Sequence, residues 1–341
     1  PVTFDDCFFF SYHVAEKIPV LEIKGRNSTS RHFAKIFDND DFFEFISLTE
    51  IAVDYSTLTD FNLIIVNDIN TISSGLAGEL AQFIENGGSV LIIPHADSDV
   101  TSYSSLFRSC GAIPWVGKKV QETKVSNINL DHPIYKDVFE DIPRNIDLPK
   151  VSSFYYGPTL SKSNTDALLS LQSGEPFLNV YDHGLGNFYV FSVSLDPQAS
   201  NLAEHALFVA SALRIAEFSV PKSPLYYTIG EDEAISLSKI ETTGDQVLHL
   251  SDSTVGLDFL PGLRQIGGVT ELFLHGQLTK AGNYDLKNNL SPLAVLGFNY
   301  SRKESLMDYY SLNEATQLLS EVKNLSILDA ELQSLKRQVQ E

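Results

Sequence analysis

The sequence predicts an α/β fold with a doubly wound, flavodoxin-like parallel sheet, followed by a second, all-β domain. Two apolar runs, at residues 61–66 and 90–94, do not alternate apolar and polar residues, so both strands should be buried on both faces, as parallel strands are. Between the runs, apolar residues recur at the spacing of a helical stripe: Leu76, Ala77, Leu80, Phe83 and Ile84. This is a βαβ unit, whose crossover is expected to be right-handed.

The helix of this unit has recognisable ends. Ser73 or Ser74 can cap its first turn, and the Gly87–Gly88 pair can supply the left-handed residue that ends it. Further strands are predicted at 18–23 and 43–48, with a short helix over 31–37 between them. That helix is expected to be capped by Ser28, Thr29 or Ser30. The order strand, helix, strand, strand, helix, strand is typical of a doubly wound sheet.

The chain before this sheet carries an aromatic run, FDDCFFFSYHV, at residues 4–14. It predicts a strand that would be an exposed edge if it stood alone. Either the strand pairs with the second domain, or it is the last strand of an upstream domain that is absent from this chain.

The second half of the α/β domain is less regular. A helix is predicted around 103–109, and residues 115–164 show prolines and no clear periodicity. Strands follow at 166–172, 176–181 and 187–194, the last two joined by a hairpin turn over 182–186. A helix over 202–218 completes a domain expected to span residues 16–220.

The sequence pattern changes after Pro221 and Pro224. Beyond them, short strand candidates are separated by turns at about ten-residue spacing, which is typical of a β-sandwich. These candidates lie at residues 225–229, 234–237, 246–250, 256–259, 270–274, 282–285 and 293–300. We expect an immunoglobulin-like sandwich over 221–310 and a helical segment over 311–341, with helices at 313–322 and 329–341.

The amino-acid composition argues against two classes of binding partner. The 341-residue chain has 24 Lys and Arg against 44 Asp and Glu, a formal charge of −20. Such a field repels nucleic acid and anionic lipid headgroups, so neither is expected as a direct partner. Two cysteines, Cys7 and Cys110, are too few for a disulfide framework or a zinc site. Because the chain starts without Met and stops within a helical pattern, we expect a soluble part of a longer protein.

Candidate site residues follow the predicted parallel strands, because ligands of open α/β sheets bind at the strands' carboxyl ends. This reasoning predicts a ligand pocket formed by Asn67, Asp68, His95, Asp97 and Asp99. His95 has the position of a nucleophile elbow, but the turn holds no Ser, Cys or Thr and lacks the small neighbours that relieve strain there. A loop histidine bonded to local backbone is the favoured interpretation, and no catalytic residue is expected.

A second candidate is the segment KGRNSTS before the first predicted helix. Lys24, Arg26, Asn27 and Ser28 could form an anion-binding loop at the helix N-terminus. The segment matches neither the dinucleotide fingerprint nor the P-loop, so a nucleotide is not expected. Asp97 and Asp99 could bind a hard cation, but no further oxygen ligands follow at a calcium-loop spacing. Solvated carboxylates are the favoured interpretation, and neither a metal nor a cofactor is expected.

Three stretches carry a resemblance to known proteins. FNLIIVNDINTISSGLAGELAQFIENGGSVLIIPHAD and GLGNFYVFSVSLDPQASNLAEHALFVASALRI resemble the class I glutamine-amidotransferase-like, or ThuA-like, fold. Together with FNYSRKESLMDYY, they are more similar still to the C-terminal extramembrane part of BatA-like, aerotolerance-type membrane proteins of Bacteroidetes. The resemblance implies a membrane-anchored parent protein, a location on the periplasmic face of the inner membrane, and protein partners in the cell envelope. It also implies that the strand in residues 1–15 belongs to a β-sandwich, and that residues 311–341 lead toward a membrane helix.

The resemblance also bears on activity. Active amidotransferases carry a glycine-flanked Cys where this chain has Pro94 and His95, and a glycine-rich oxyanion loop near the position of Asn67 and Asp68. The leading interpretation is therefore a non-catalytic interaction or structural module of a cell-envelope protein. The alternative is a ThuA-like enzyme, or a domain binding a sugar or anion at the carboxyl ends of the parallel strands.

Overall fold

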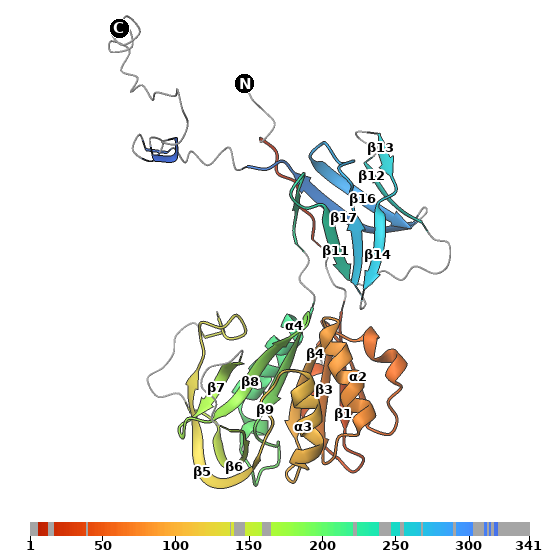
Figure 1. The fold of residues 1–341 in the computed structure, drawn as a ribbon. Coiled ribbons are helices and arrows are strands. Elements are labelled where there is room, and N and C mark those ends of the chain that lie inside the picture. Colours follow the sequence, from red (N-terminus) through yellow and green to blue (C-terminus); the bar gives the residue numbers. More distant parts are fainter. Residues whose placement is uncertain are drawn as a thin grey trace, which may run out of the picture.

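The computed structural model describes most of the chain. The described residues are 6–12, 17–38, 40–136, 138–139, 147–158, 165–220, 224–238, 247–252, 256–266, 269–288, 291–302, 310–311, 314 and 317–319. They form a mixed α/β unit with one large sheet, and a second unit of smaller sheets (Figure 1).

The large sheet has nine strands in the order β2-β1-β3-β4-β9-β8-β7-β5-β6. Its parallel half consists of β1 (Ile18–Lys24), β2 (Phe43–Thr49), β3 (Leu63–Ile69), β4 (Ser89–Pro94) and β9 (Gly186–Phe191). The predicted parallel pairing of the central unit is confirmed, with Leu63 opposite Ser89 and Val66 opposite Ile92. Every residue of β4 is buried, as the unbroken apolar run requires.

Helices cover both faces of this sheet. On one face, α1 (His32–Phe37) and α4 (Ala206–Phe218) contribute to one hydrophobic cluster. On the other face, a second cluster contains residues of the 3₁₀ turn η1 (Tyr55–Asp60), α2 (Ser74–Glu85) and α3 (Val100–Ser109). Two clusters on opposite faces of one sheet make a three-layer α/β/α arrangement.

The helix ends follow local chemistry. Ser73 Oγ accepts the Leu76 N–H at 3.1 Å, and Gly87 has φ +104° just after α2, so both predicted signals operate. The predicted cap of α1 is wrong, because Arg31 occupies the cap position and makes no side-chain capping bond. The helix predicted over 202–218 is divided into a 3₁₀ turn, η2 (Leu202–Glu204), and α4, because His205 caps α4 by accepting the Leu207 N–H at 3.0 Å.

The region expected to be irregular contains two strands, β5 (Gly117–Ile128) and β6 (Lys150–Tyr156). They pair antiparallel with each other, and β5 also pairs with β7 (Thr165–Leu171), which leads through β8 (Pro176–His183) to β9. The prediction failed because most residues of β5 are exposed, so the strand has no buried face to create an alternating pattern. The hairpin between β8 and β9 is confirmed.

The edge strand β6 also forms backbone hydrogen bonds with the chain that follows β9. Tyr155 N–H donates to the Ser192 carbonyl at 2.7 Å, and Ser152 N–H donates to the Ala199 carbonyl at 2.7 Å. Val151 and Ser200 also form an isolated antiparallel bridge. The antiparallel half of the sheet therefore curls, and β6 comes to lie beside the carboxyl end of β4.

The second unit has a five-stranded sheet, β10-β17-β16-β12-β13, and a three-stranded sheet, β11-β15-β14, which share one hydrophobic cluster. The strand predicted at 225–229 is only two residues long, and the sequence pattern gave no sign of β14. The bounds are β10 (Tyr227–Thr228), β11 (Ala234–Ser238), β12 (Leu248–Asp252), β13 (Leu257–Phe259), β14 (Gly262–Ile266), β15 (Val269–Phe273), β16 (Gly282–Asn288) and β17 (Ser291–Asn299). The immunoglobulin-like assignment and the domain limits stay predictions.

The predicted N-terminal strand is wrong for the part that the structure describes, because residues 6–12 form no strand. Instead, Phe9 N–H donates to Asn299 Oδ1 at 2.8 Å, and Asn299 Nδ2 donates to the Phe9 carbonyl at 2.7 Å. The Asn299 side-chain amide thus satisfies the N–H and the carbonyl of Phe9, which a neighbouring strand would otherwise have bonded. Ser11 N–H donates to the Leu225 carbonyl at 2.8 Å, so this segment lies along the second unit.

The predicted helix over 313–322 falls largely outside the described residues, and the one over 329–341 falls wholly outside them. Within the described parts of the chain, no helix combines the length and apolar character needed to cross a membrane.

Candidate functional site

The carboxyl edge of the parallel strands carries a strained residue. Asp68 has φ +59°, at a point where the register between β3 and β4 shifts. Positive φ is uncommon for residues other than glycine, and such residues concentrate at functional sites. Gly25 makes the conformation possible, because a Cβ at Gly25 would lie 2.2 Å from the Asp68 carbonyl oxygen. The sequence offered no indication of this turn.

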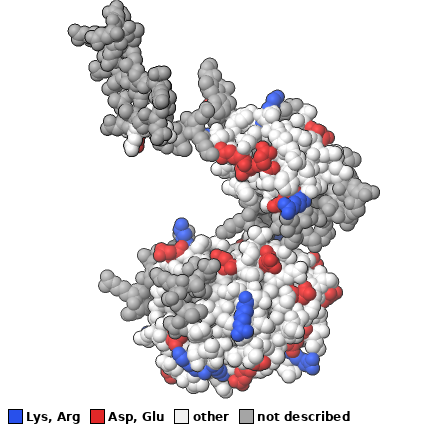
Figure 2. All heavy atoms as spheres, in the orientation of Figure 1, with Lys and Arg blue, Asp and Glu red and all other residues white. Residues whose placement is uncertain are grey.

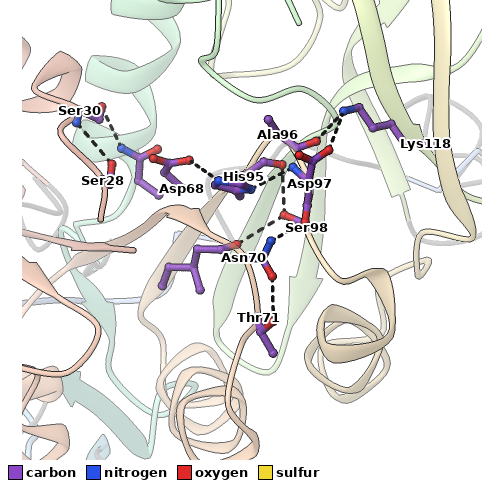
Figure 3. Close-up of polar contacts among 12 residues, drawn as sticks. Ser28, Ser30, Asp68, Asn70, Thr71, His95, Ala96, Asp97, Ser98 and Lys118 are labelled. Atoms are coloured by element: carbon purple, nitrogen blue, oxygen red, sulfur yellow. Dashed lines mark hydrogen bonds and ion pairs between the residues drawn. The ribbon is translucent and has the colours of Figure 1, made fainter. Parts of the chain in front are cut away.

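His95, directly after β4, faces this residue. Its Nε2 lies 3.9 Å from Asp68 Oδ1, and its Nδ1 accepts the Asp97 N–H at 2.9 Å (Figure 3). Because Nδ1 is the acceptor, the proton of the neutral ring is on Nε2, directed toward the carboxylate. Both side chains are about one-third exposed, at 36% and 35%. Of the five predicted pocket residues, His95 and Asp68 are the two whose side chains the structure pairs.

The loop over 95–99 is fixed from its other side by β6. The Tyr155 hydroxyl accepts the Ser98 N–H at 2.6 Å and lies 3.0 Å from the carbonyl oxygens of His95 and Ala96, to either of which it can donate. Ser98 Oγ lies 3.2 Å from the His95 carbonyl oxygen and donates to it. The loop is therefore held by hydrogen bonds within the protein, and sequence reasoning missed Tyr155 because it lies on an unpredicted strand.

Aromatic rings fill the space behind this loop. Trp115 stacks on Tyr155 with centroids 4.8 Å apart, and Tyr103 lies 5.3 Å from Trp115. Both Tyr103 and Trp115 are buried, and burial raises the pKa of the Tyr155 and Tyr103 hydroxyls, which stay protonated donors. On this side of β4, the carboxyl end of the sheet is packed rather than open.

Asp97 and Asp99 do not join the His95 pair. Asp99 Oδ1 accepts the Thr101 N–H at 3.0 Å, which makes it the N-cap of α3. The Asp97 carboxylate, 82% exposed, lies 3.4 Å from Lys118 Nζ, which also donates to the Ala96 carbonyl at 2.6 Å. The two carboxylates have separate structural contacts, and their predicted role in a common pocket stays untested.

Asn67 lies below the surface with a buried carboxylate. Its Nδ2 donates to Glu22 Oε1 at 2.7 Å, while Ser47 Oγ donates to Glu22 Oε2 at 2.6 Å. Glu22 and Asn67 are each 1% exposed, and Asn67 Oδ1 has no hydrogen-bond partner among the residues that the structure describes. A carboxylate inside the apolar run IPVLEI is the signal that could have revealed this buried group, since unpaired charges are costly to bury.

The predicted anion loop adopts a local turn. Ser28 N–H donates to the Gly25 carbonyl at 3.0 Å, and Ser28 Oγ accepts the Ser30 N–H at 3.3 Å (Figure 3). Lys24 ends β1, and the helix that follows the loop has six residues. The loop formed by Lys24, Arg26, Asn27 and Ser28 therefore stays a prediction as an anion site.

The geometry limits the chemistry of the His95 pair. In this tautomer the Nδ1 lone pair is taken by a backbone N–H, and the Nε2 proton faces Asp68, so the ring can donate but has no free lone pair for a general base. Within the described residues, no thiol or hydroxyl makes a hydrogen bond to the imidazole. The same residues contain no group of three or more His, Cys, Asp and Glu that could hold a metal ion.

The fold and the site define a mixed α/β protein with a large, parallel-rich sheet and additional smaller sheets. No protein-family model matches the chain, and neither does any curated protein. Its likenesses are to solved structures.

Three of these structures illustrate the degree of similarity. A cytoplasmic protein from Salmonella typhimurium is 12% identical, with a TM-score of 0.45 over 58% of this chain and 98% of that one. A ThuA-like protein from Bacteroides uniformis is 16% identical, with a TM-score of 0.46 over 62% of this chain and 94% of that one. A β-galactosidase from Bacillus circulans is 12% identical, with a TM-score of 0.39 over 74% of this chain and 41% of that one. At TM-scores below 0.5, these likenesses support no inference about activity.

Proposed function

We propose that the α/β unit is a non-catalytic module that acts through contacts with other proteins. One observation carries the proposal. At the position where an α/β hydrolase or amidotransferase presents its nucleophile, this chain has a histidine whose Nδ1 accepts a backbone N–H and whose loop is fixed by Tyr155. A Ser, Thr or Cys nucleophile needs a base within hydrogen-bond reach, and within the described residues no hydroxyl or thiol makes a hydrogen bond to the His95 imidazole.

The test is an assay of turnover with the full chain. Purified protein is incubated with glutamine and with an activated ester, and the rate is compared with that of His95→Ala and of buffer. The proposal expects no rate that depends on His95. Turnover that the His95→Ala substitution abolishes, in a variant whose thermal unfolding stays cooperative, contradicts a non-catalytic role.

The setting of this module is part of the proposal. The resemblance of the three quoted stretches to BatA-like proteins supports a periplasmic location, in an aerotolerance-type protein assembly anchored in the inner membrane. Protease treatment of intact spheroplasts from the native source tests it. A periplasmic unit is digested under these conditions, and a unit that is protected until the membrane is lysed contradicts the location.

A second function is favoured by the strained Asp68. Its carboxylate and the His95 imidazole are both about one-third exposed and present an acceptor and a donor side by side. A small polar ligand such as a sugar or an anion could use both. A thermal-shift screen against these ligands and against divalent metals separates the two functions. A ligand at 100 times its Kd adds about 2.7 kcal/mol to the free energy of unfolding. A positive shift that Asp68→Asn and His95→Ala both remove favours the ligand site.

A further inference from the structure

The antiparallel pair of strands β5 and β6 concentrates positive charge on a strongly acidic chain. We call the four lysines Lys118, Lys119, Lys124 and Lys150 the lysine ribbon; the first three lie on β5 and the last on β6. The whole chain has 24 basic residues against 44 acidic ones. Figure 2 shows basic atoms along the lower left rim of the α/β unit, where Figure 1 places β5 and β6.

Two lysines of the ribbon stand directly opposite each other. Lys124 pairs with Lys150 across the antiparallel ladder, and both are exposed. Directly opposed side chains in such a ladder have Cβ atoms about 4.5–5.5 Å apart, so like charges there destabilise the sheet. Neither lysine forms an ion pair with a described residue, whereas Lys118 is paired with Asp97 and Lys119 with Glu175. The cost of the opposed ammonium groups is thus not relieved within the described structure.

The same strand has an unpaired backbone edge. On one edge, β5 pairs with β6 from Gly117 to Lys124; on the other, it pairs with β7 only from Val125 to Ile128. Over residues 117–123, the second edge faces no described strand. Val120, which is 85% exposed, lies along this stretch. An unpaired strand edge is the surface to which an extended peptide can add by main-chain hydrogen bonds.

We propose that this edge of β5 and the lysine ribbon bind an acidic, extended segment of a partner protein. Charge complementarity selects the partner, because an acidic segment neutralises Lys124 and Lys150 together. Lysines on an edge strand also deter pairing between copies of one chain, since a second copy presents the same positive edge. This inference rests on the proposed interaction function and names the chemistry of the partner.

The test uses the full chain and a fluorescein-labelled ten-residue peptide that alternates Glu and Val. Fluorescence anisotropy is measured at low and at high salt for the wild type, for K124Q/K150Q, and for K35Q/K280Q. The last pair removes two exposed lysines from α1 and from the second unit, so it changes the net charge equally. We expect K124Q/K150Q to weaken binding by about fivefold to tenfold, and the control pair by less than about twofold.

Hydrogen exchange locates the peptide. Bound peptide should slow exchange of the backbone amides within residues 118–123, and high salt should weaken binding. Absence of binding to the wild type, equal loss in the control pair, equal affinity for a Lys–Val peptide, or protection confined to another region each overturns the inference. These outcomes are independent of the proposed non-catalytic role, which fails through turnover that depends on His95.

Discussion

Replacing Tyr155 by Phe tests whether β6 holds the loop over 95–98. The substitution keeps the ring that stacks on Trp115 and removes only the hydroxyl, which accepts the Ser98 N–H at 2.6 Å. Ser98 is buried, so its N–H loses its partner where water does not replace it easily. An unsatisfied buried donor costs about 1–3 kcal/mol. For a domain of this size, 1 kcal/mol corresponds to about 2–4 °C in Tm, so Tyr155→Phe should lower Tm by about 2–12 °C.

The adjacent residue provides a matched control. Tyr156 also contacts a neighbour through its ring, with Lys119 Nζ 4.5 Å from the ring centroid, and Tyr156→Phe keeps that ring. Thermal and urea unfolding of both variants, with hydrogen exchange at the Ser98 amide, measures the difference. If Tyr155→Phe costs no more than Tyr156→Phe, or if Ser98 exchange is unchanged, the loop is not held by this hydroxyl and the reasoning is refuted.

Three further predictions concern other parts of the chain. Gly25→Ala should lower the free energy of unfolding by about 1–3 kcal/mol, because the new Cβ meets the Asp68 carbonyl oxygen. Asp68→Gly should raise it by about 1 kcal/mol, because glycine adopts the positive φ of this position without strain. Urea unfolding measures both values, and a stabilising Gly25→Ala or a destabilising Asp68→Gly contradicts the strain. Native iodoacetamide treatment followed by mass spectrometry should label exposed Cys7 quickly and Cys110 slowly, because burial raises the pKa of the Cys110 thiol to about 12; equal rates disprove this. Burial lowers the pKa of His32 below 6.5, so the unfolded chain binds the proton more readily and the free energy of unfolding should fall as the pH drops below 6.5. In urea titrations at several pH values, His32→Gln should make this pH dependence weaker. An unchanged pH dependence shows that His32 is not its cause.

The parallel half of the sheet was predictable because burial on both faces leaves a direct mark on the sequence. β3 and β4 are almost wholly buried, and their apolar runs gave their positions to within a few residues. The cap at Ser73 and the left-handed Gly87 are local interactions and were predicted for that reason. By contrast, β5 owes its conformation to its neighbours, because its own residues are mostly exposed and charged.

The candidate site was only partly predictable for a related reason. Topology places His95 and Asp68 at one edge of the sheet, so their proximity followed from the order of the strands. Their detailed arrangement depends on a bulge at Asp68 and on Gly25, which are tertiary features without a sequence pattern. Tyr155 was unpredictable because it reaches the loop from a strand 57 positions away from Ser98 in the sequence.

The position of β6 connects the His95 site with the lysine ribbon. Figure 3 shows the His95–Asp68 pair with Ser28 and Ser30 on one side and with Asp97 and Lys118 on the other. Tyr155 and Lys118 hold the loop from the β5–β6 side through hydrogen bonds to the carbonyl oxygens of His95 and Ala96. Lys118 belongs to the lysine ribbon and contacts this loop, whereas Lys124 and Lys150 make no hydrogen bond or ion pair with it in the part of the chain that the structure describes. Substitutions at Lys124 and Lys150 should therefore leave ligand shifts at His95 unchanged, and coupling between the two would require movement of Lys118.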